Sequence, residues 1–204
     1  MHVFFDVDGV LIDGYSNNPK LHRPWHGSLE KDLNIDPVDM QRHLFTPRFF
    51  DVAVGKRDLH EAVGEFLQAV SSTVSAQELI DYWFKKDSVL NDALWHWLDE
   101  KSRLPKEKLF IATNQEKNRA SYLWNDLAFK NRFSDIFYSG DLGVSKSDQA
   151  FFETVRQRTG LNPQECLLVD DTQKVIDTAK VCGWRTVLYE GPESLESLDR
   201  ILAS

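Results

Sequence analysis

Two carboxylates, Asp6 and Asp8, follow directly on an apolar run at the start of the chain, His2-Val3-Phe4-Phe5. Residues i and i+2 of a β-strand point to the same side, so the two side chains project together where this strand ends. Like charges held so close need a cation or a shared proton between them. A hard, oxygen-seeking ion such as Mg²⁺ is the usual solution. On this motif alone, a plain turn at the end of a strand is an alternative interpretation.

The composition is that of a globular protein. The 204 residues suffice for one domain with a sizeable insertion, and 42% of them are hydrophobic. The formal net charge of -8 argues against a nucleic-acid surface, which needs clustered Lys and Arg. A small phosphorylated metabolite is still compatible with this charge, because one local positive site is enough to bind it.

The sequence shows no sign of a membrane or of an oxidising compartment. No stretch approaches the ~20 apolar residues of a membrane span, and Asp6 interrupts the apolar start that a signal peptide would need. Cys166 and Cys182 lack the spacing of a zinc site or a redox pair. We therefore expect a cytoplasmic protein with neither membrane nor nucleic acid as partner, and the sequence leaves its oligomeric state open.

Apolar runs of strand length alternate with segments of helix length over most of the chain. The predicted strands are 2–7, 109–112, 135–140, 166–169 and 185–189. The predicted helices between and after them are 91–101, 116–129, 149–159, 172–182 and 193–202. This alternation predicts an α/β fold in which helices cover both faces of a parallel sheet.

The segment between the first two strands has a helical pattern instead. Its predicted helices are 37–44 after Asp36, 59–70 after Asp58, and one after Ser75, which forms a capping-box pattern with Glu78. We interpret residues 14–90 as a helical insertion and residues 1–13 with 91–204 as the core. Candidates for the entrance to a site within the insertion are His22, Arg23, Trp25, His26, Arg48, Phe49 and Phe50. Lys56 and Arg57 could contact an anionic substrate or be solvated.

Polar residues stand at or shortly after the ends of four predicted strands. They are Asp6, Thr113, Asn114, Lys146, Asp170 and Asp171. Ligands of parallel sheets bind beyond the carboxyl ends of the strands, so these residues should share one edge. Taken singly, Thr113-Asn114 suits a turn, Lys146 a solvated surface, and Asp170-Asp171 the cap of a helix. Their joint order and placement favour a phosphoryl-transfer site.

In such a site Asp6 would be the nucleophile, because a carboxylate that attacks phosphorus forms an aspartyl-phosphate. Asp8 would protonate the leaving alcohol and then deprotonate water. The Asp6 carboxylate, the Asp8 backbone carbonyl and an acidic residue of Asp170-Asp171 would hold Mg²⁺. The Thr113 hydroxyl and the Asn114 N–H would donate to a phosphoryl oxygen, while Lys146 would neutralise charge on the nucleophile and the phosphate.

Four segments resemble the motifs of the haloacid dehalogenase-like (HAD) hydrolase superfamily: residues 5–11, 112–114, Lys146 and 168–171. The resemblance spans residues 2 to about 190. It implies a Rossmann-like three-layer core with a helical cap inserted after the first motif, and residues 55–59 resemble a turn of that cap. In relatives with an Asp-Asp pair the second Asp ligates Mg²⁺, which implies Asp171 as the ligand and Asp170 in support. One departure is Ser147, where relatives usually have proline.

The superfamily contains several chemistries, and Asp8 discriminates among them. A halide leaving group needs no proton, so Asp8 favours hydrolysis of phosphate monoesters over 2-haloacid dehalogenation. A sugar-phosphate mutase of the β-phosphoglucomutase type has similar motifs and is an alternative. A non-catalytic protein that binds a phosphorylated ligand is another, although such a protein would not need Asp8 as a proton donor. The sequence thus predicts a Mg²⁺-dependent phosphatase of small metabolites.

Overall fold

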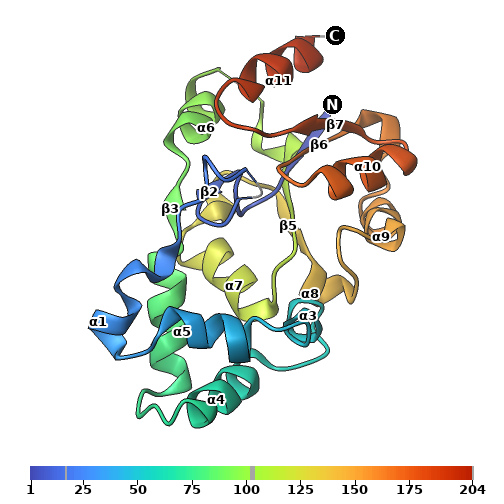
Figure 1. Cartoon of the computed structure of the whole chain (residues 1–204). Helices are drawn as coiled ribbons and strands as arrows, with labels where there is room; N and C mark the ends of the chain where they lie inside the picture. Colours follow the sequence, from blue (N-terminus) through green and yellow to red (C-terminus); the bar gives the residue numbers. More distant parts are fainter. Residues whose placement is uncertain (17, 102–103, 204) are drawn as a thin grey trace.

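The centre of the molecule is a sheet of five parallel strands in the order β5-β4-β1-β6-β7 (Figure 1). The computed structural model describes residues 1–16, 18–101 and 104–203. The strands are β1 (His2–Phe5), β4 (Leu109–Thr113), β5 (Asp135–Tyr138), β6 (Cys166–Asp170) and β7 (Arg185–Leu188). The predicted α/β fold with a parallel sheet is confirmed, and the first strand of the chain is the central one.

Helices cover both faces of this sheet because successive strand residues enter two different apolar clusters. Val3 and Phe5 of β1 belong to one cluster, and Phe4 belongs to the other. Helices of the first cluster are α6 (Asp92–His96), α7 (Lys117–Asn125) and α11 (Ser194–Ala203). Helices of the second are α9 (Gln149–Thr159) and α10 (Gln173–Val181). The result is a three-layer arrangement of the Rossmann type.

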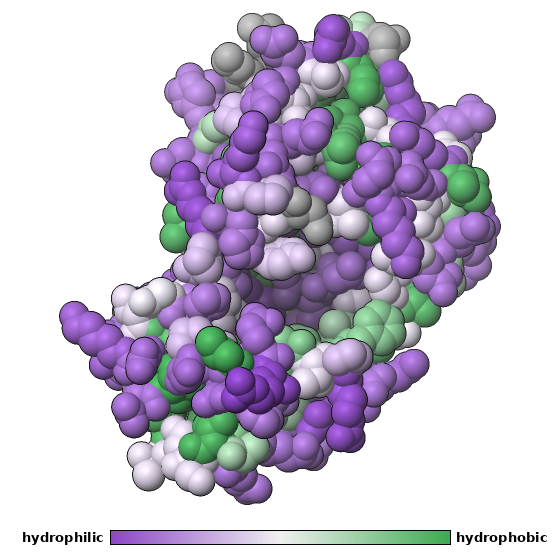
Figure 2. All heavy atoms as spheres, viewed as in Figure 1, coloured by the Kyte–Doolittle hydropathy of each residue, from purple (hydrophilic) through white to green (hydrophobic). Residues whose placement is uncertain are grey.

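Residues 25–86 form a second group of helices with an apolar cluster of their own, in which Val63, Phe66 and Leu79 are buried. The elements are a 3₁₀ turn (Trp25–Ser28), α1 (Leu29–Leu33), α2 (Pro37–Asp39), a π-helical turn (Met40–Leu44), α3 (Phe49–Ala53), α4 (Leu59–Ala69) and α5 (Ala76–Lys86). We call this group the helical segment. It lies on the side of the sheet where the strands end (Figure 1), and the surface is hollowed between the two (Figure 2).

A short antiparallel ladder stands where the chain enters and leaves the helical segment. β2 (Ile12–Asp13) pairs with β3 (Val89–Leu90), with Ile12 opposite Leu90 and Asp13 opposite Val89. Neither of these two strands is among those predicted from the sequence. Two-residue strands escape prediction, because so short a segment has no periodicity to recognise.

Apart from residues 37–44, the predicted helices are confirmed, and Asp36, Asp58 and Ser75 each accept a backbone hydrogen bond as caps. Two are confirmed only in part: after α6 the predicted helix 91–101 continues as a π-helical turn (Trp97–Lys101), and the predicted helix 116–129 ends at Asn125 as α7. The predicted helix 37–44 was wrong as a continuous α-helix. After α2 it continues as the π-helical turn, in which the Phe45 N–H donates to the Met40 carbonyl, and Pro47 stands two residues further on. The predicted strand 135–140 is two residues too long, because β5 ends at Tyr138 and a short helix, α8 (Ser139–Leu142), begins directly after it. Among the described residues, no helix is long and apolar enough to cross a bilayer.

Candidate active site

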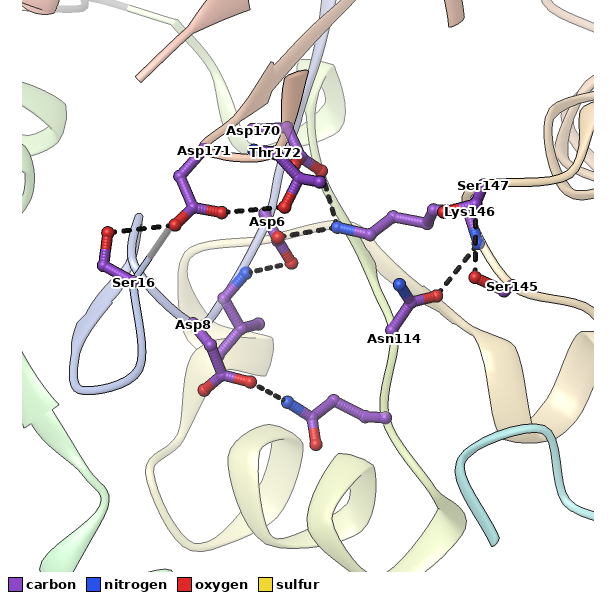
Figure 3. A network of polar contacts seen from close by, with 12 residues as sticks. Asp6, Asp8, Ser16, Asn114, Ser145, Lys146, Ser147, Asp170, Asp171 and Thr172 are labelled. Carbon is purple, nitrogen blue, oxygen red and sulfur yellow. Dashed lines mark hydrogen bonds and ion pairs between the residues drawn. The ribbon is translucent and has the colours of Figure 1, made fainter. Parts of the chain in front are cut away.

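Polar side chains from three strand ends and one loop meet at the carboxyl edge of the sheet (Figure 3). Asp6 follows β1, Thr113 is the last residue of β4, and Asp170 is the last residue of β6. Lys146 comes from the loop between α8 and α9. The central position of β1, between β4 and β6, explains why Asp6 lies in the middle of this group.

Lys146 connects two of the carboxylates. Its Nζ lies 2.7 Å from Asp6 Oδ2 and 2.6 Å from Asp170 Oδ2, and its side chain is 1% exposed. Burial alone would lower the pKa of this ammonium, but Asp170 and Asp6 more than offset it and the pKa is raised. The Lys146 backbone N–H donates to Asn114 Oδ1 at 2.9 Å, which fixes the loop against the end of β4. The Lys146 side chain is therefore fixed in position and protonated.

Three buried carboxylates lie close enough to share one cation. Asp6, Asp170 and Asp171 each offer an oxygen, and these atoms lie within 4.8 Å of one another. Burial raises the pKa of Asp6 well above its usual value; Lys146 lowers it, whereas the charges of Asp170 and Asp171 raise it further. One ammonium cannot balance three carboxylates, so this donor set fits a divalent cation that prefers oxygen ligands.

The two adjacent carboxylates are held in different ways. Asp170 Oδ2 accepts from Lys146 and its Oδ1 accepts from the Thr172 backbone N–H at 2.9 Å. Asp171 Oδ2 accepts from the Ser16 hydroxyl at 3.0 Å, and Oδ1 from the Thr172 hydroxyl at 3.2 Å. Neutral hydroxyls engage a carboxylate less strongly than an ammonium does. Asp170 therefore orients Lys146, and both carboxylates belong to the group that could share a cation.

Gly9 lies against the Asp171 carboxylate. Its φ is +75°, and a Cβ at this position would lie 2.4 Å from Asp171 Oδ2. Both the left-handed backbone and the close approach require glycine here. The glycine that follows the D-x-D motif therefore gives the turn its shape and leaves room for a carboxylate from another strand.

Asp8 stands beside this cluster rather than in it. Its Oδ2 accepts a 2.5 Å hydrogen bond from Gln115 Nε2. Burial raises the pKa of Asp8; Arg119, Gln115 and Lys146 oppose this, and the net pKa is above the usual value. A carboxyl group with a raised pKa can carry a proton to a leaving group. A metal contact from Asp8 would have to come from its carbonyl group, because its side chain is outside the described carboxylates that could share a cation.

The two remaining predicted residues differ in exposure. Thr113 is buried at the end of β4, whereas Asn114 is exposed apart from its contact with the loop that carries Lys146. The departure at Ser147 has a structural reason. The Ser147 N–H donates to Ser145 Oγ at 3.2 Å, a hydrogen bond that proline could not make.

The predicted entrance candidates divide into two groups. His22, Trp25 and His26 line a cavity of about 430 Å³ that also includes Asp8. The other candidates, and Lys56 and Arg57 with them, lie elsewhere. Arg48 is exposed directly before α3, Arg23 pairs with Asp13, and Arg57 pairs with Glu65. Phe49 packs against the apolar cluster of the helical segment, and Phe50 and Lys56 line a different cavity.

Several residues around Asp8 were not predicted. Gln115 donates a hydrogen bond to the Asp8 carboxylate. Asp87 lines the cavity of about 430 Å³ that includes Asp8. Arg119 is buried, and its Nη1 donates at 2.9 Å to both the Phe84 carbonyl and the Ser88 hydroxyl, which joins α7 to the end of α5. Of these residues, only Gln115 could have been identified from the sequence, because it directly follows the Thr113-Asn114 motif.

Fold and site together define the class: a three-layer α/β protein with buried carboxylates and one lysine at the carboxyl edge of a parallel sheet. The chain belongs to the haloacid dehalogenase-like hydrolase family, whose model matches residues 1–183. The predicted resemblance to this family is thereby confirmed. A search of curated protein sequences found no match.

Solved structures with the same fold carry this family description. An HAD family enzyme from Bacteroides thetaiotaomicron, in a magnesium complex, is 16% identical over 98% of both chains, with a TM-score of 0.76. A structure of that enzyme with magnesium and inorganic phosphate is 15% identical over 90% of this chain and 91% of the other, with a TM-score of 0.69. A predicted HAD-like hydrolase from Porphyromonas gingivalis is 20% identical over 99% and 97%, with a TM-score of 0.73. At these identities the likeness concerns the fold.

Proposed function

We propose that this protein is a Mg²⁺-dependent phosphatase that hydrolyses phosphate monoesters of small molecules through an aspartyl-phosphate on Asp6. The observation that carries the proposal is the position of Lys146 between Asp6 and Asp170, with Asp171 in the same buried cluster. The magnesium and phosphate in the B. thetaiotaomicron structure are consistent with a site of this kind.

The metal would be held by Asp6, by Asp171 and by the Asp8 carbonyl, with Asp170 in support. Bound there, Mg²⁺ would reduce the repulsion between an anionic nucleophile and an anionic phosphate. The same cation would lower the pKa of Asp6, which burial raises in its absence. The nucleophile would then be ionised at neutral pH.

The protein's own residues carry the two half-reactions. An Asp6 oxygen attacks phosphorus as the ester P–O bond breaks, and Asp8 gives its proton to the departing alcohol oxygen. A water molecule then attacks the phosphorus of the aspartyl-phosphate and gives a proton to Asp8, which releases inorganic phosphate and restores Asp6. Lys146, the Thr113 hydroxyl and the Asn114 N–H neutralise or hold the phosphoryl oxygens.

We further propose that residues 14–90 act as a cap whose lining selects the alcohol part of the substrate. The cavity beside Asp8 supports this, because its lining combines Asp8 with rings of the helical segment such as Trp25 and Phe45. The raised pKa of Asp8 favours an ester substrate over a carbon–halogen bond, since only the ester needs a proton donor.

The test is release of phosphate from p-nitrophenyl phosphate. We expect activity with Mg²⁺, loss of activity with EDTA and recovery on adding Mg²⁺ back. Asp6→Asn should lose at least about 10³-fold in kcat, because an amide cannot replace the attacking carboxylate. Asp81→Asn, on the exposed side of α5, is the matched control and should keep the activity. A purified, folded protein that releases no phosphate with Mg²⁺ would contradict the proposal.

A further inference from the structure

The cavity beside Asp8 has aromatic walls that hold one another in place. The Trp25 and Trp83 rings are stacked at 5.7 Å between centroids with an interplanar angle of 20°. Phe45 meets Trp83 edge-on at 5.3 Å. Tyr15 and His22 form a further edge-on pair at 5.4 Å on the same cavity. A ligand would therefore find preformed π-faces rather than flexible side chains.

A second carboxylate, Asp87, completes this lining. It is the residue after α5, and its Oδ2 accepts from Trp83 Nε1 at 3.2 Å, so one of the ring walls also fixes the carboxylate. Oδ1 of Asp87 and Oδ1 of Asp8 are buried and accept no hydrogen bond from the part of the chain that the structure describes. The negative charge on this wall is only partly satisfied by the protein.

The described lining of the cavity contains Asp8 and Asp87 but neither lysine nor arginine. Asp8 is the proposed proton donor and is neutral in that role, so Asp87 supplies the negative charge of this wall. Arg119 donates to the Phe84 and Asp87 backbone carbonyls and to the Ser88 hydroxyl, and Lys146 contacts Asp6 and Asp170, so neither cation forms an ion pair with the Asp87 carboxylate in the described part of the chain. Aromatic faces beside a carboxylate without a directly paired cation are a setting in which proteins bind organic cations.

We infer that this cavity selects phosphate monoesters whose alcohol part carries a positively charged nitrogen, such as an amino alcohol. The inference rests on the proposed phosphatase function, because it places the phosphate at Asp6 and the cationic alcohol among Trp25, Trp83 and Asp87. A cavity of about 430 Å³ has ample room for such a group.

The test compares esters that differ only in the charge of one atom. Phosphocholine is paired with 3,3-dimethylbutyl phosphate, its neutral carbon isostere, and phosphoethanolamine is paired with n-propyl phosphate. We expect kcat/KM to be about tenfold higher for the cationic member of at least one pair, the size of effect that a desolvated cation–π contact supplies. Equal or better turnover of the neutral member in both pairs would overturn the inference.

Asp87→Asn then shows whether Asp87 is the source of the preference. It should reduce kcat/KM for the cationic ester much more than for its neutral isostere, whereas Asp81→Asn should leave the ratio unchanged. A ratio that is unaltered in Asp87→Asn would also overturn the inference. If that variant did not fold, the pairwise comparison on the wild-type protein would still decide.

Hydrolysis of p-nitrophenyl phosphate distinguishes failure of the inferred substrate class from failure of the proposed phosphatase function. Activity on this ester without preference for a cation would reject the substrate class and leave the phosphatase standing. Inactivity towards p-nitrophenyl phosphate and all four alkyl esters would reject the proposed function itself.

Discussion

Gln115 Nε2 donates a 2.5 Å hydrogen bond to Oδ2 of Asp8, although the two residues belong to segments far apart in the chain. The bond stabilises the ionised form of Asp8 and lowers a pKa that burial raises. The pKa of the carboxyl group proposed as the general acid is therefore lowered by an amide from the segment that follows β4. This gives Gln115 a role that can be separated from binding of metal and phosphate.

Replacing Gln115 should move the pH profile in a defined direction. Gln115→Leu removes a donor to the carboxylate, so the pKa of Asp8 should rise. Because Asp8 must be protonated to act as an acid, the alkaline limb of kcat/KM should shift to higher pH. Steady-state rates between pH 5 and 10 measure this, with Gln157→Leu on exposed α9 as the control. A shift to lower pH would contradict the role proposed for Gln115.

Lys146→Met should destabilise the metal-free protein strongly, because it leaves buried carboxylates without their ammonium partner. Breaking a buried ion pair from one side costs about 3–5 kcal/mol. Urea unfolding should show this loss without Mg²⁺ and a smaller loss with it, and acid should narrow the difference as the carboxylates become protonated. Lys180→Met on the exposed side of α10 should change little. Equal losses for the two variants would show that Lys146 does not hold the cluster together.

Gly9→Ala tests the close approach of the first turn to Asp171. Alanine at a left-handed position costs about 1–2 kcal/mol wherever it occurs. Gly160 has a similar φ, +70°, but no neighbour within 4 Å of an added Cβ. Gly160→Ala should therefore lose only the stability that the left-handed backbone costs. We expect Gly9→Ala to be the less stable of the two and to bind Mg²⁺ more weakly by calorimetry. Equal Mg²⁺ affinity in the two variants would mean that Asp171 is not a metal ligand.

Asp87 should make the metal-free protein less stable at neutral pH than in mild acid. Burial, and then the charge of Asp8, raise the pKa of Asp87 from 3.8 to about 6 in the folded protein. The folded state thus binds more protons than the unfolded state between these values, and this group's contribution to stability grows as the pH falls through 6.

Asp87→Asn should therefore raise the free energy of unfolding at pH 8 by roughly 1–3 kcal/mol, the equivalent of a shift of this size. The gain should shrink towards pH 4.5, where the wild-type carboxyl group is already largely neutral. Paired denaturation curves at the two pH values check this. A gain of the same size at both would show that charge is not the cause.

The parallel sheet and the cluster at its edge could be predicted because each depends on short, contiguous patterns. The apolar run before Asp6 and the run Cys166 to Val169 before Asp170 indicate strands, and the carboxyl ends of parallel strands meet at one edge. Lys146 could be placed only by its order among these motifs.

Ser16, Gln115 and Asp87 show where this reasoning ends. Ser16 and Gln115 make their contacts across gaps in sequence that no periodicity spans. Asp87 is held locally by Trp83, four residues earlier, but its place in the cavity beside Asp8 is not a local feature. Whether Asp87 faces Asp8 depends on how the helical segment sits against the sheet, which is a matter of tertiary packing. The same holds for the aromatic walls, because Trp25 and Trp83 come from opposite ends of that segment.

Asp13 pairs with Val89, so the chain leaves the core and re-enters it at neighbouring positions, before and after the helical segment. No strand of the five-stranded sheet lies between those two residues, so lengthening or shortening the intervening stretch leaves the register of β1 against β4 and β6 untouched. Substitutions and length changes in that stretch can therefore alter the lining beside Asp8 while the carboxylates at the edge of the sheet keep their places. In the phosphatase proposed here, this would allow new substrates without a change of the reacting groups.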